Sequence, residues 1–144
     1  MSVVRIKQEH LAGLASLESL CFAEPWSEKA LELLLGDTAV GLACLDETGV
    51  PVAYVGMITV LDEGQITNVA THPDFRRRGL ADKLLCELLI QARARGLAIL
   101  SLEVRESNTA AIRLYEKHGF SVVGRRNHFY KNPSEHALIM LCNL

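Results

Sequence analysis

The sequence lacks the residue clusters and long apolar runs that mark metal-binding and membrane proteins. Its 144 residues include four cysteines and five histidines, but there is no Cys-x-x-Cys pair and no pair of histidines at ligand spacing. We therefore expect no metal site. Each cysteine has apolar neighbours, a pattern that indicates small buried side chains and favours a reducing, cytoplasmic compartment.

Long hydrophobic segments are also missing. No stretch of about 18 apolar residues is present, so we expect no membrane span. The first twenty residues carry four charges and no apolar region of the length that a signal peptide needs. Hydrophobic residues make up 49% of the chain and charged residues 22%, which excludes a disordered or low-complexity protein. The length predicts a single domain over residues 1–144.

The small net charge of −2 argues against direct binding to nucleic acid, but the charge is unevenly distributed. Residues 1–72 hold three basic residues and ten acids, a net charge of −7. Residues 73–144 hold twelve basic residues and seven acids, a net charge of +5. This asymmetry predicts an anionic ligand on the second half and a cationic ligand near the first.

Hydrophobic periodicity predicts an α/β protein in which hairpins come first and βαβ crossovers follow, so that the sheet is mixed. Ser27 has the position of a helix N-cap. The expected strands are residues 3–6, 40–45, 51–61, 65–71, 99–104, 120–126 and 137–142. The expected helices are residues 8–22, 28–35, 80–95 and 108–118.

The most informative segment is residues 69–81, where a strand ends, three arginines follow and a helix begins at Gly79. A helix N-terminus presents unpaired backbone N–H groups and the positive end of the helix dipole. Gly79 lets a ligand approach the backbone closely, so the segment suits a pyrophosphate. It matches neither the dinucleotide-binding nor the P-loop pattern. A solvated basic loop before an ordinary helix is the alternative interpretation.

The pattern R-x-x-G-x-A at residues 76–81 resembles the acetyl-CoA signature of the Gcn5-related N-acetyltransferase (GNAT) family. The pattern N-x-x-A-x-x-L-Y-x-x-x-G-F at residues 108–120 is similar to the second motif of that family. The resemblance implies an acyl-CoA N-acyltransferase fold of about seven strands and four helices. The sheet would be splayed between strands 65–71 and 99–104.

The resemblance also implies where acetyl-CoA binds. The pantetheine arm would pair with the backbone of Val69 and Thr71, and Asn108 would hydrogen-bond to the arm. The pyrophosphate would lie on the N–H groups of residues 77–82. The cofactor-binding residues implied in this way are Val69, Ala70, Thr71, Arg76, Arg77, Arg78, Gly79, Leu80, Ala81, Asp82 and Asn108.

Residues 25–28, 102–108 and 125–130 resemble the ribosomal-protein alanine N-acetyltransferases within the family. This resemblance implies acetylation of an N-terminal alanine of a ribosomal protein. It places the general base at Glu103 and the proton donor at Tyr115. The alternatives are a strand-end Glu103 paired with an arginine and a core tyrosine at position 115. Because no cysteine lies in either motif, we expect direct attack in a ternary complex, without an acetyl-enzyme.

The acceptor side is expected to involve Trp26, Arg126 and Tyr130. Trp26 could equally pack in the core. A basic acceptor segment would suit the acids that the family places around this opening, which are Glu24, Glu28, Glu32, Asp62 and Glu63. Two other functions stay open from the sequence: acetylation of a small-molecule amine and a non-catalytic acyl-CoA-binding module.

Overall fold

A computed structural model describes all 144 residues, and its centre is one seven-stranded sheet. The strand order is β1-β2-β3-β4-β5-β7-β6, and β4 and β5 are the only parallel neighbours. The mixed sheet predicted from the sequence is therefore confirmed. The strands are β1 (Val3–Arg5), β2 (Ala39–Leu45), β3 (Pro51–Val60), β4 (Glu63–Thr71), β5 (Ile99–Arg105), β6 (Ser121–Tyr130) and β7 (Glu135–Asn143).

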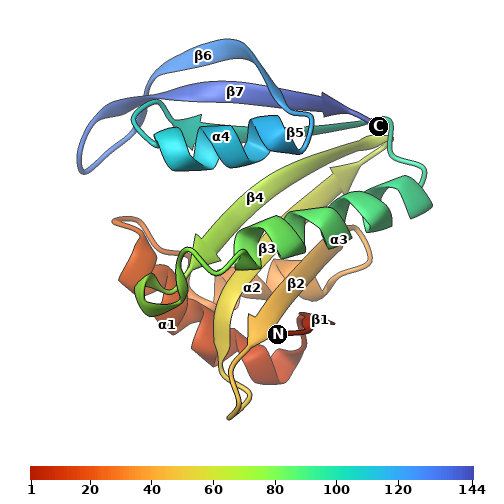
Figure 1. The fold of residues 1–144 in the computed structure, drawn as a ribbon, viewed down its shortest axis with the longest axis vertical. Helices are drawn as coiled ribbons and strands as arrows, with labels where there is room; N and C mark the ends of the chain where they lie inside the picture. Colours follow the sequence, from red (N-terminus) through yellow and green to blue (C-terminus); the bar gives the residue numbers. More distant parts are fainter.

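The helices cover both faces of the sheet and bury two separate apolar clusters (Figure 1). On one face, α3 and α4 contribute Leu84, Leu88 and Tyr115 to a cluster of 22 buried residues. On the other face, α1 and its neighbours contribute Leu11 and Leu14 to a cluster of ten. The helical elements are η1 (Gln8–His10), α1 (Leu11–Cys21), α2 (Glu28–Leu31), η2 (Glu32–Leu35), η3 (Pro73–Phe75), α3 (Leu80–Ala94) and α4 (Thr109–Lys117).

The sheet splays between β4 and β5. Only Glu63–Gln65 of β4 pairs with Ile99–Ser101 of β5, and beyond these three residues the strands separate. In β4, Thr67 is the extra residue of a bulge, because Gly56 of β3 pairs with Asn68 while Met57 pairs with Ile66. A bulge bends its strand and increases the local twist. The splay predicted between residues 65–71 and 99–104 is confirmed.

Three elements differ from the sequence-based expectation. The first predicted helix begins as the 3-10 turn η1, and the second divides into α2 and the 3-10 turn η2. The last predicted strand pair is longer than expected, because β6 continues to Tyr130 and pairs there with Glu135. The polar loop of the hairpin is correspondingly shorter. Ser27 caps α2 as predicted, since its hydroxyl accepts the N–H of Ala30.

The four cysteines differ in burial, although all of them have apolar neighbours in the sequence. Cys44 and Cys142 are buried as expected, but Cys21 is partly exposed and Cys86 is exposed. The prediction of a buried side chain was therefore wrong for Cys86, which lies on the solvent side of an amphipathic helix. Every helix in the structure is too short or too polar to span a bilayer.

Candidate active site

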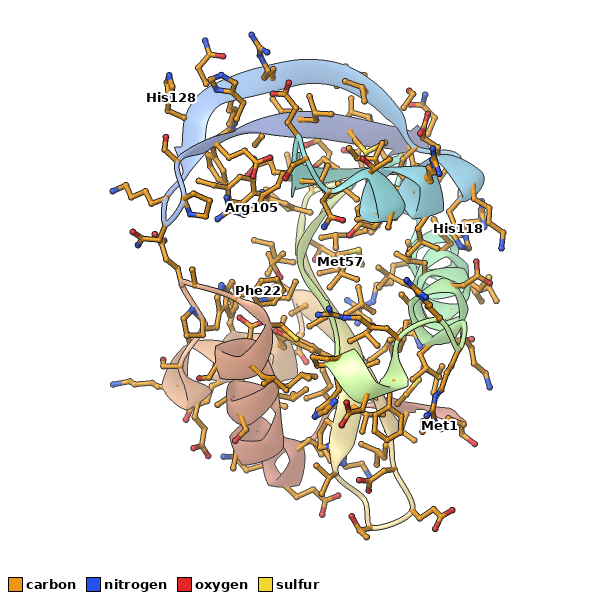
Figure 2. All side chains as sticks on the ribbon, turned by 60° about the vertical axis from the view of Figure 1, so that its left-hand side comes forward. Met1, Phe22, Met57, Arg105, His118 and His128 are labelled. Carbon is orange, nitrogen blue, oxygen red and sulfur yellow. The ribbon has the colours of Figure 1, made fainter.

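A pocket of about 570 Å³ opens where β4 and β5 separate. One wall comes from α1, the segment after it and β4, and includes Phe22 and Trp26. The other wall comes from β5, α4 and the β6–β7 hairpin, and includes Arg105. Figure 2 shows Phe22 and Arg105 on opposite sides of this opening. Both proposed catalytic residues, Glu103 and Tyr115, line the same pocket.

Glu103 lies on β5 with its side chain 16% exposed. Its Oε1 is 3.5 Å from Nε of Arg126 on β6, so the sequence alternative of an arginine partner is also present. Tyr130 lies nearby. Burial, and next the charge of Glu103, raise the pKa of Tyr130 to about 12, so this phenol stays protonated at neutral pH. The Glu103 carboxylate thus lines the pocket and also contacts the guanidinium of Arg126.

Tyr115 lies on α4 and is 6% exposed. Burial, and next the neighbouring Tyr130, raise the pKa of Tyr115 well above its usual range. A phenol with a raised pKa keeps its proton at neutral pH, where it can donate a hydrogen bond, but it is a weaker acid than a free tyrosine. The core-tyrosine alternative also holds in part, because the ring packs in the α3–α4 cluster near Phe120.

Asn108 caps a helix and also lines the pocket. Its Oδ1 accepts the N–H of Ala111 and caps α4, which fixes where the helix of Tyr115 begins. The residue also lines the pocket. The cap leaves the side-chain amide nitrogen of Asn108 available to a ligand.

Arg105 organises the β6–β7 hairpin, a role that the sequence analysis missed. Its guanidinium donates to the carbonyl oxygens of Pro133 and Lys131, both at 3.0 Å, and forms an ion pair with Glu135 at 3.3 Å. It also stacks over the ring of Tyr130, with its Cζ 4.5 Å from the ring centroid. Because one side chain contacts four residues of the hairpin, it holds that wall of the pocket in place.

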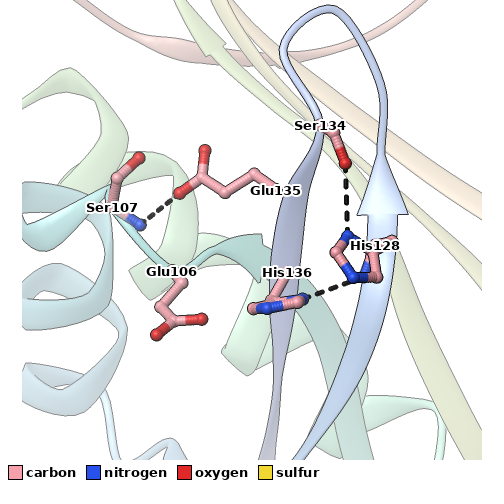
Figure 3. A pocket seen from close by; sticks show the side chains of 6 residues that line it. All are labelled: Glu106, Ser107, His128, Ser134, Glu135 and His136. Atoms are coloured by element: carbon pink, nitrogen blue, oxygen red, sulfur yellow. Dashed lines mark hydrogen bonds between the residues drawn. The ribbon is translucent and has the colours of Figure 1, made fainter.

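A second, shallower hollow on the outside of the hairpin shows how the turn is fixed (Figure 3). Glu135 accepts the backbone N–H of Ser107 at 2.6 Å, which ties the hairpin to the segment before α4. His128 has a positive φ of 53°, and its N–H is accepted by Nδ1 of His136 at 2.9 Å. All six residues that line this hollow are polar or charged, and none of them lines the pocket.

A buried carboxylate lies at the base of the opposite wall. Glu18 is 1% exposed and accepts two hydrogen bonds, from the N–H of Trp26 at 2.9 Å and from the hydroxyl of Tyr54 at 2.7 Å. Burial, and next the charge of Glu18, raise the pKa of Tyr54 strongly. These bonds connect α1, β3 and the segment before α2. They therefore fix Trp26, which lines the pocket and also packs against the α1 cluster.

Comparison with known proteins identifies the fold. The model of the acetyltransferase (GNAT) family matches residues 11–120. The chain belongs to the GNAT family. The [ribosomal protein bS18]-alanine N-acetyltransferase of Escherichia coli K12 is 39% identical over 141 residues, covering 96% of this chain and 95% of that protein. The enzyme of the same description from Haemophilus influenzae is 35% identical over the full length of both chains.

Solved GNAT structures agree with the fold. The crystal structure of the ribosomal-protein-S18-alanine N-acetyltransferase from E. coli superposes with a TM-score of 0.90 at 34% identity, covering 99% of this chain and 92% of that one. Arabidopsis thaliana NAA60 has a TM-score of 0.89 at 18% identity, which shows a shared fold alone. The resemblance drawn from residues 76–81 and 108–120 is thereby confirmed at the level of the family and fold.

The GNAT signature forms a basic turn (residues 76–82) at the start of α3. Gly79 has a φ of +75° and open space around the position of a Cβ, so its backbone is accessible. Arg78 stacks over Phe75, with its Cζ 4.8 Å from the ring centroid. The start of this 15-residue helix presents unpaired backbone N–H groups, the feature by which helix N-termini bind anions. Leu80 is buried in the core, so only its backbone can meet a ligand.

The remaining residues predicted to bind acetyl-CoA do not all lie in the pocket. Among the cofactor-binding predictions, Val69 and Asn108 line the pocket, whereas the basic turn lies outside it. The carbonyl oxygen of Thr71 already accepts Nε of Arg76 at 3.2 Å and Sγ of Cys21 at 3.5 Å. Ala70 is buried in the α1 cluster, which leaves its backbone alone for contact.

The acceptor-side predictions need one correction. Of the five acids expected around the opening, only Glu24 lines the pocket. Glu63 pairs with Ile99, and the carbonyl of Asp62 accepts the N–H of Ala98, so both lie at the closed end of the splay. Tyr130 lines the pocket, whereas Arg126 is not among the lining residues and forms an ion pair with Glu103. Glu18, which the sequence analysis did not assign, is the buried acid of this wall.

Proposed function

We propose that the protein transfers the acetyl group of acetyl-CoA to the α-amine of an N-terminal alanine, with ribosomal protein bS18 as the acceptor. The observation that carries the proposal is the single pocket at the splay, which places Glu103 and Tyr115 in one cavity. The printed names of the E. coli and H. influenzae relatives supply the acceptor. A protein acceptor of this kind is in keeping with a cytoplasmic location.

The acceptor must lose a proton before it attacks a thioester. A free α-amine has a pKa near 8 and a lysine near 10.4, so deprotonation at pH 7 costs ~1.4 kcal/mol for the first and ~4.6 kcal/mol for the second. A carboxylate base can therefore deprotonate an α-amine more readily than a lysine. Glu103, mostly shielded but open to the pocket, takes this proton directly or through water.

Tyr115 acts at the other end of the reaction. Attack of the amine on the thioester carbonyl forms the C–N bond and a tetrahedral intermediate. Collapse of that intermediate restores the carbonyl, breaks the C–S bond and releases a thiolate. The phenol of Tyr115 keeps its proton at neutral pH and donates a hydrogen bond to the sulfur as negative charge develops there. Because its raised pKa makes it a weaker acid than a free tyrosine, transfer of the proton to the thiolate is the costly part of this step.

Direct transfer is favoured over an acetyl-enzyme. Cys21 is the one cysteine that lines the pocket, and burial is the largest effect on its pKa, which is raised. A thiol with a raised pKa is a weak nucleophile at neutral pH. We propose that the basic turn and the backbone of β4 hold acetyl-CoA, while Trp26 and Tyr130 flank the incoming peptide.

The acceptor assignment is tested with a panel of substrates. Acetyl-CoA turnover is measured with the N-terminal peptide of bS18, the same peptide with a blocked amine, a peptide whose only free amine is a lysine, and a polyamine. We expect turnover with the free N-terminal alanine alone. Preference for the polyamine or the lysine peptide would overturn the proposal, and acetyl-CoA binding without any turnover would favour a non-catalytic module.

A further inference from the structure

A second group of reactive side chains lies outside the pocket, where the end of α4 packs against the first half of α3. Asp82 and Cys86 lie one turn apart on α3, and His118 follows α4 directly. One carboxylate oxygen, one thiol sulfur and one ring nitrogen of these residues lie within 4.8 Å of one another. Figure 2 labels His118 at this position, beside α3.

We propose that Asp82, Cys86 and His118 form a binding site for a zinc-type divalent cation. Thiolate, imidazole and carboxylate are the three ligand types that Zn²⁺ takes in proteins, whereas Mg²⁺ and Ca²⁺ take oxygen ligands. Three protein ligands leave a fourth tetrahedral position to water. This site is separate from the pocket. Asp82 would enter it through its side chain, whereas the acetyl-CoA contact proposed for residues 77–82 uses their backbone N–H groups.

The spacing of the ligand atoms is close to what such a cation needs. Zinc bond lengths of about 2.0–2.3 Å place the ligand atoms of a tetrahedral site about 3.4–3.7 Å apart. Nε2 of His118 is already 2.8 Å from Oδ1 of Asp82, and the His118 side chain is only 8% exposed, so its ring is held by packing. Cys86 is exposed and can change its rotamer to complete the site.

The local charges act in both directions. The C-terminal end of α4 contributes the negative end of a helix dipole, whereas Asp82 lies in the first turn of α3, where the dipole is positive. Nζ of Lys117 lies 2.9 Å from Oδ1 of Asp82, so this carboxylate already has a cationic partner. A doubly charged ion that gains a thiolate and an imidazole as well as the carboxylate would displace the lysine. Lys117 therefore competes with the metal ion for the Asp82 carboxylate.

The competition between Lys117 and a metal ion gives a variant that tests whether the Asp82 carboxylate takes part in metal binding. Removing the ammonium with Lys117→Met should tighten the binding of Zn²⁺, because the competing charge is gone. A surface thiol that binds metal by itself would keep its affinity in Asp82→Asn and His118→Gln, because it uses neither side chain. The metal would also join α3, which carries the basic turn, to α4, which carries Tyr115.

The experiment titrates metal-free full-length protein with ZnCl₂ by calorimetry and with Co²⁺ by absorption, which reports thiolate ligation and tetrahedral geometry. We expect one equivalent to bind, Cys86→Ser, His118→Gln and Asp82→Asn each to weaken binding at least tenfold, and Lys117→Met to strengthen it. Cys21→Ser and His72→Gln are matched controls that should leave the affinity unchanged. MgCl₂ should not bind.

Three results would overturn the site. They are no zinc binding at 100 µM metal, a loss with Cys86→Ser that neither His118→Gln nor Asp82→Asn reproduces, and no gain with Lys117→Met. Circular dichroism checks that each variant is folded. Cys86→Ser keeps the test valid even if His118→Gln unfolds, because Cys86 is exposed and the change is conservative.

Discussion

Arg126 and Glu103 form an ion pair across two strands that are not neighbours, with 3.5 Å between Nε and Oε1. The arginine side chain is 57% exposed, and exposed pairs of this kind contribute about 0–1 kcal/mol to stability. The pair therefore holds the carboxylate loosely. Glu103 can exchange this partner for an amine in the pocket at little cost.

Glu103→Gln should lower kcat by about 10²-fold or more, because an amide cannot accept the proton of the acceptor amine. Acetyl-CoA affinity and the melting temperature should change little. Arg126→Met is the matched control, since it removes the same ion pair and keeps the base. If Arg126→Met lowered kcat as much as Glu103→Gln does, the role of Glu103 would be that of an ion-pair partner.

Tyr115→Phe should lower kcat by about 10²-fold with acetyl-CoA binding preserved, because the variant lacks the proton for the thiolate. The raised pKa of Tyr115 also predicts that kcat of the wild type shows no fall from loss of this proton below about pH 10. The pH profiles of both proteins check this. A wild-type fall near pH 9 that Tyr115→Phe abolishes would contradict it.

Glu18→Ala should destabilise the protein by about 3 kcal/mol, because it leaves the N–H of Trp26 and the hydroxyl of Tyr54 without an acceptor. Glu18→Gln should cost less, since its amide oxygen still accepts one bond. Urea unfolding measures both values. Because Glu18 fixes the segment of Trp26, the KM for the peptide should rise in Glu18→Gln while the KM for acetyl-CoA stays constant.

Protonation of the Glu135 carboxylate should lower the stability of the protein in acid. Hydrogen bonds from Ser107 hold its pKa below the usual range. A lowered folded-state pKa gives stability that is complete above the unfolded value of about 4.3 and is lost as the pH falls through the folded value. Unfolding measured from pH 6 to pH 3 should therefore show a difference between wild type and Glu135→Gln that disappears toward pH 3. A constant difference would contradict this.

Gly79→Ala should cost about 1 kcal/mol of stability, because its φ of +75° is unfavourable for alanine even though the space is open. Gly49→Ala is a matched control with a φ of +88° and equally open space. Both variants should lose similar stability in urea. Only Gly79→Ala should weaken acetyl-CoA binding in a calorimetric titration, since only Gly79 begins α3.

Local chemistry made much of this fold predictable. Ser27 has an N-cap side chain in the predicted place, and its hydroxyl accepts the N–H of Ala30. The glycine-containing basic turn preceded the helix as expected. These signals act over a few residues, so a single sequence contains them.

Long-range pairing explains what was missed. The extension of β6 depends on the pairing of Tyr130 with Glu135, and the anchoring role of Arg105 depends on a hairpin about 28 residues away in the chain. The hydrogen bond between Asp82 and His118 joins residues 36 positions apart in the sequence. Such contacts are set by the tertiary fold, which also moved Asp62 and Glu63 to the closed end of the splay.

The three-residue ladder between β4 and β5 makes the two parts of the chain mechanically distinct. Ten of the 21 residues that line the pocket precede residue 70 and eleven follow residue 101. A substrate held between them therefore links two strands that share only three paired residues. Bound acetyl-CoA should couple the unfolding of the two parts, and the hairpin β6–β7 with α4 should exchange its amide hydrogens more slowly in the complex than in the free protein.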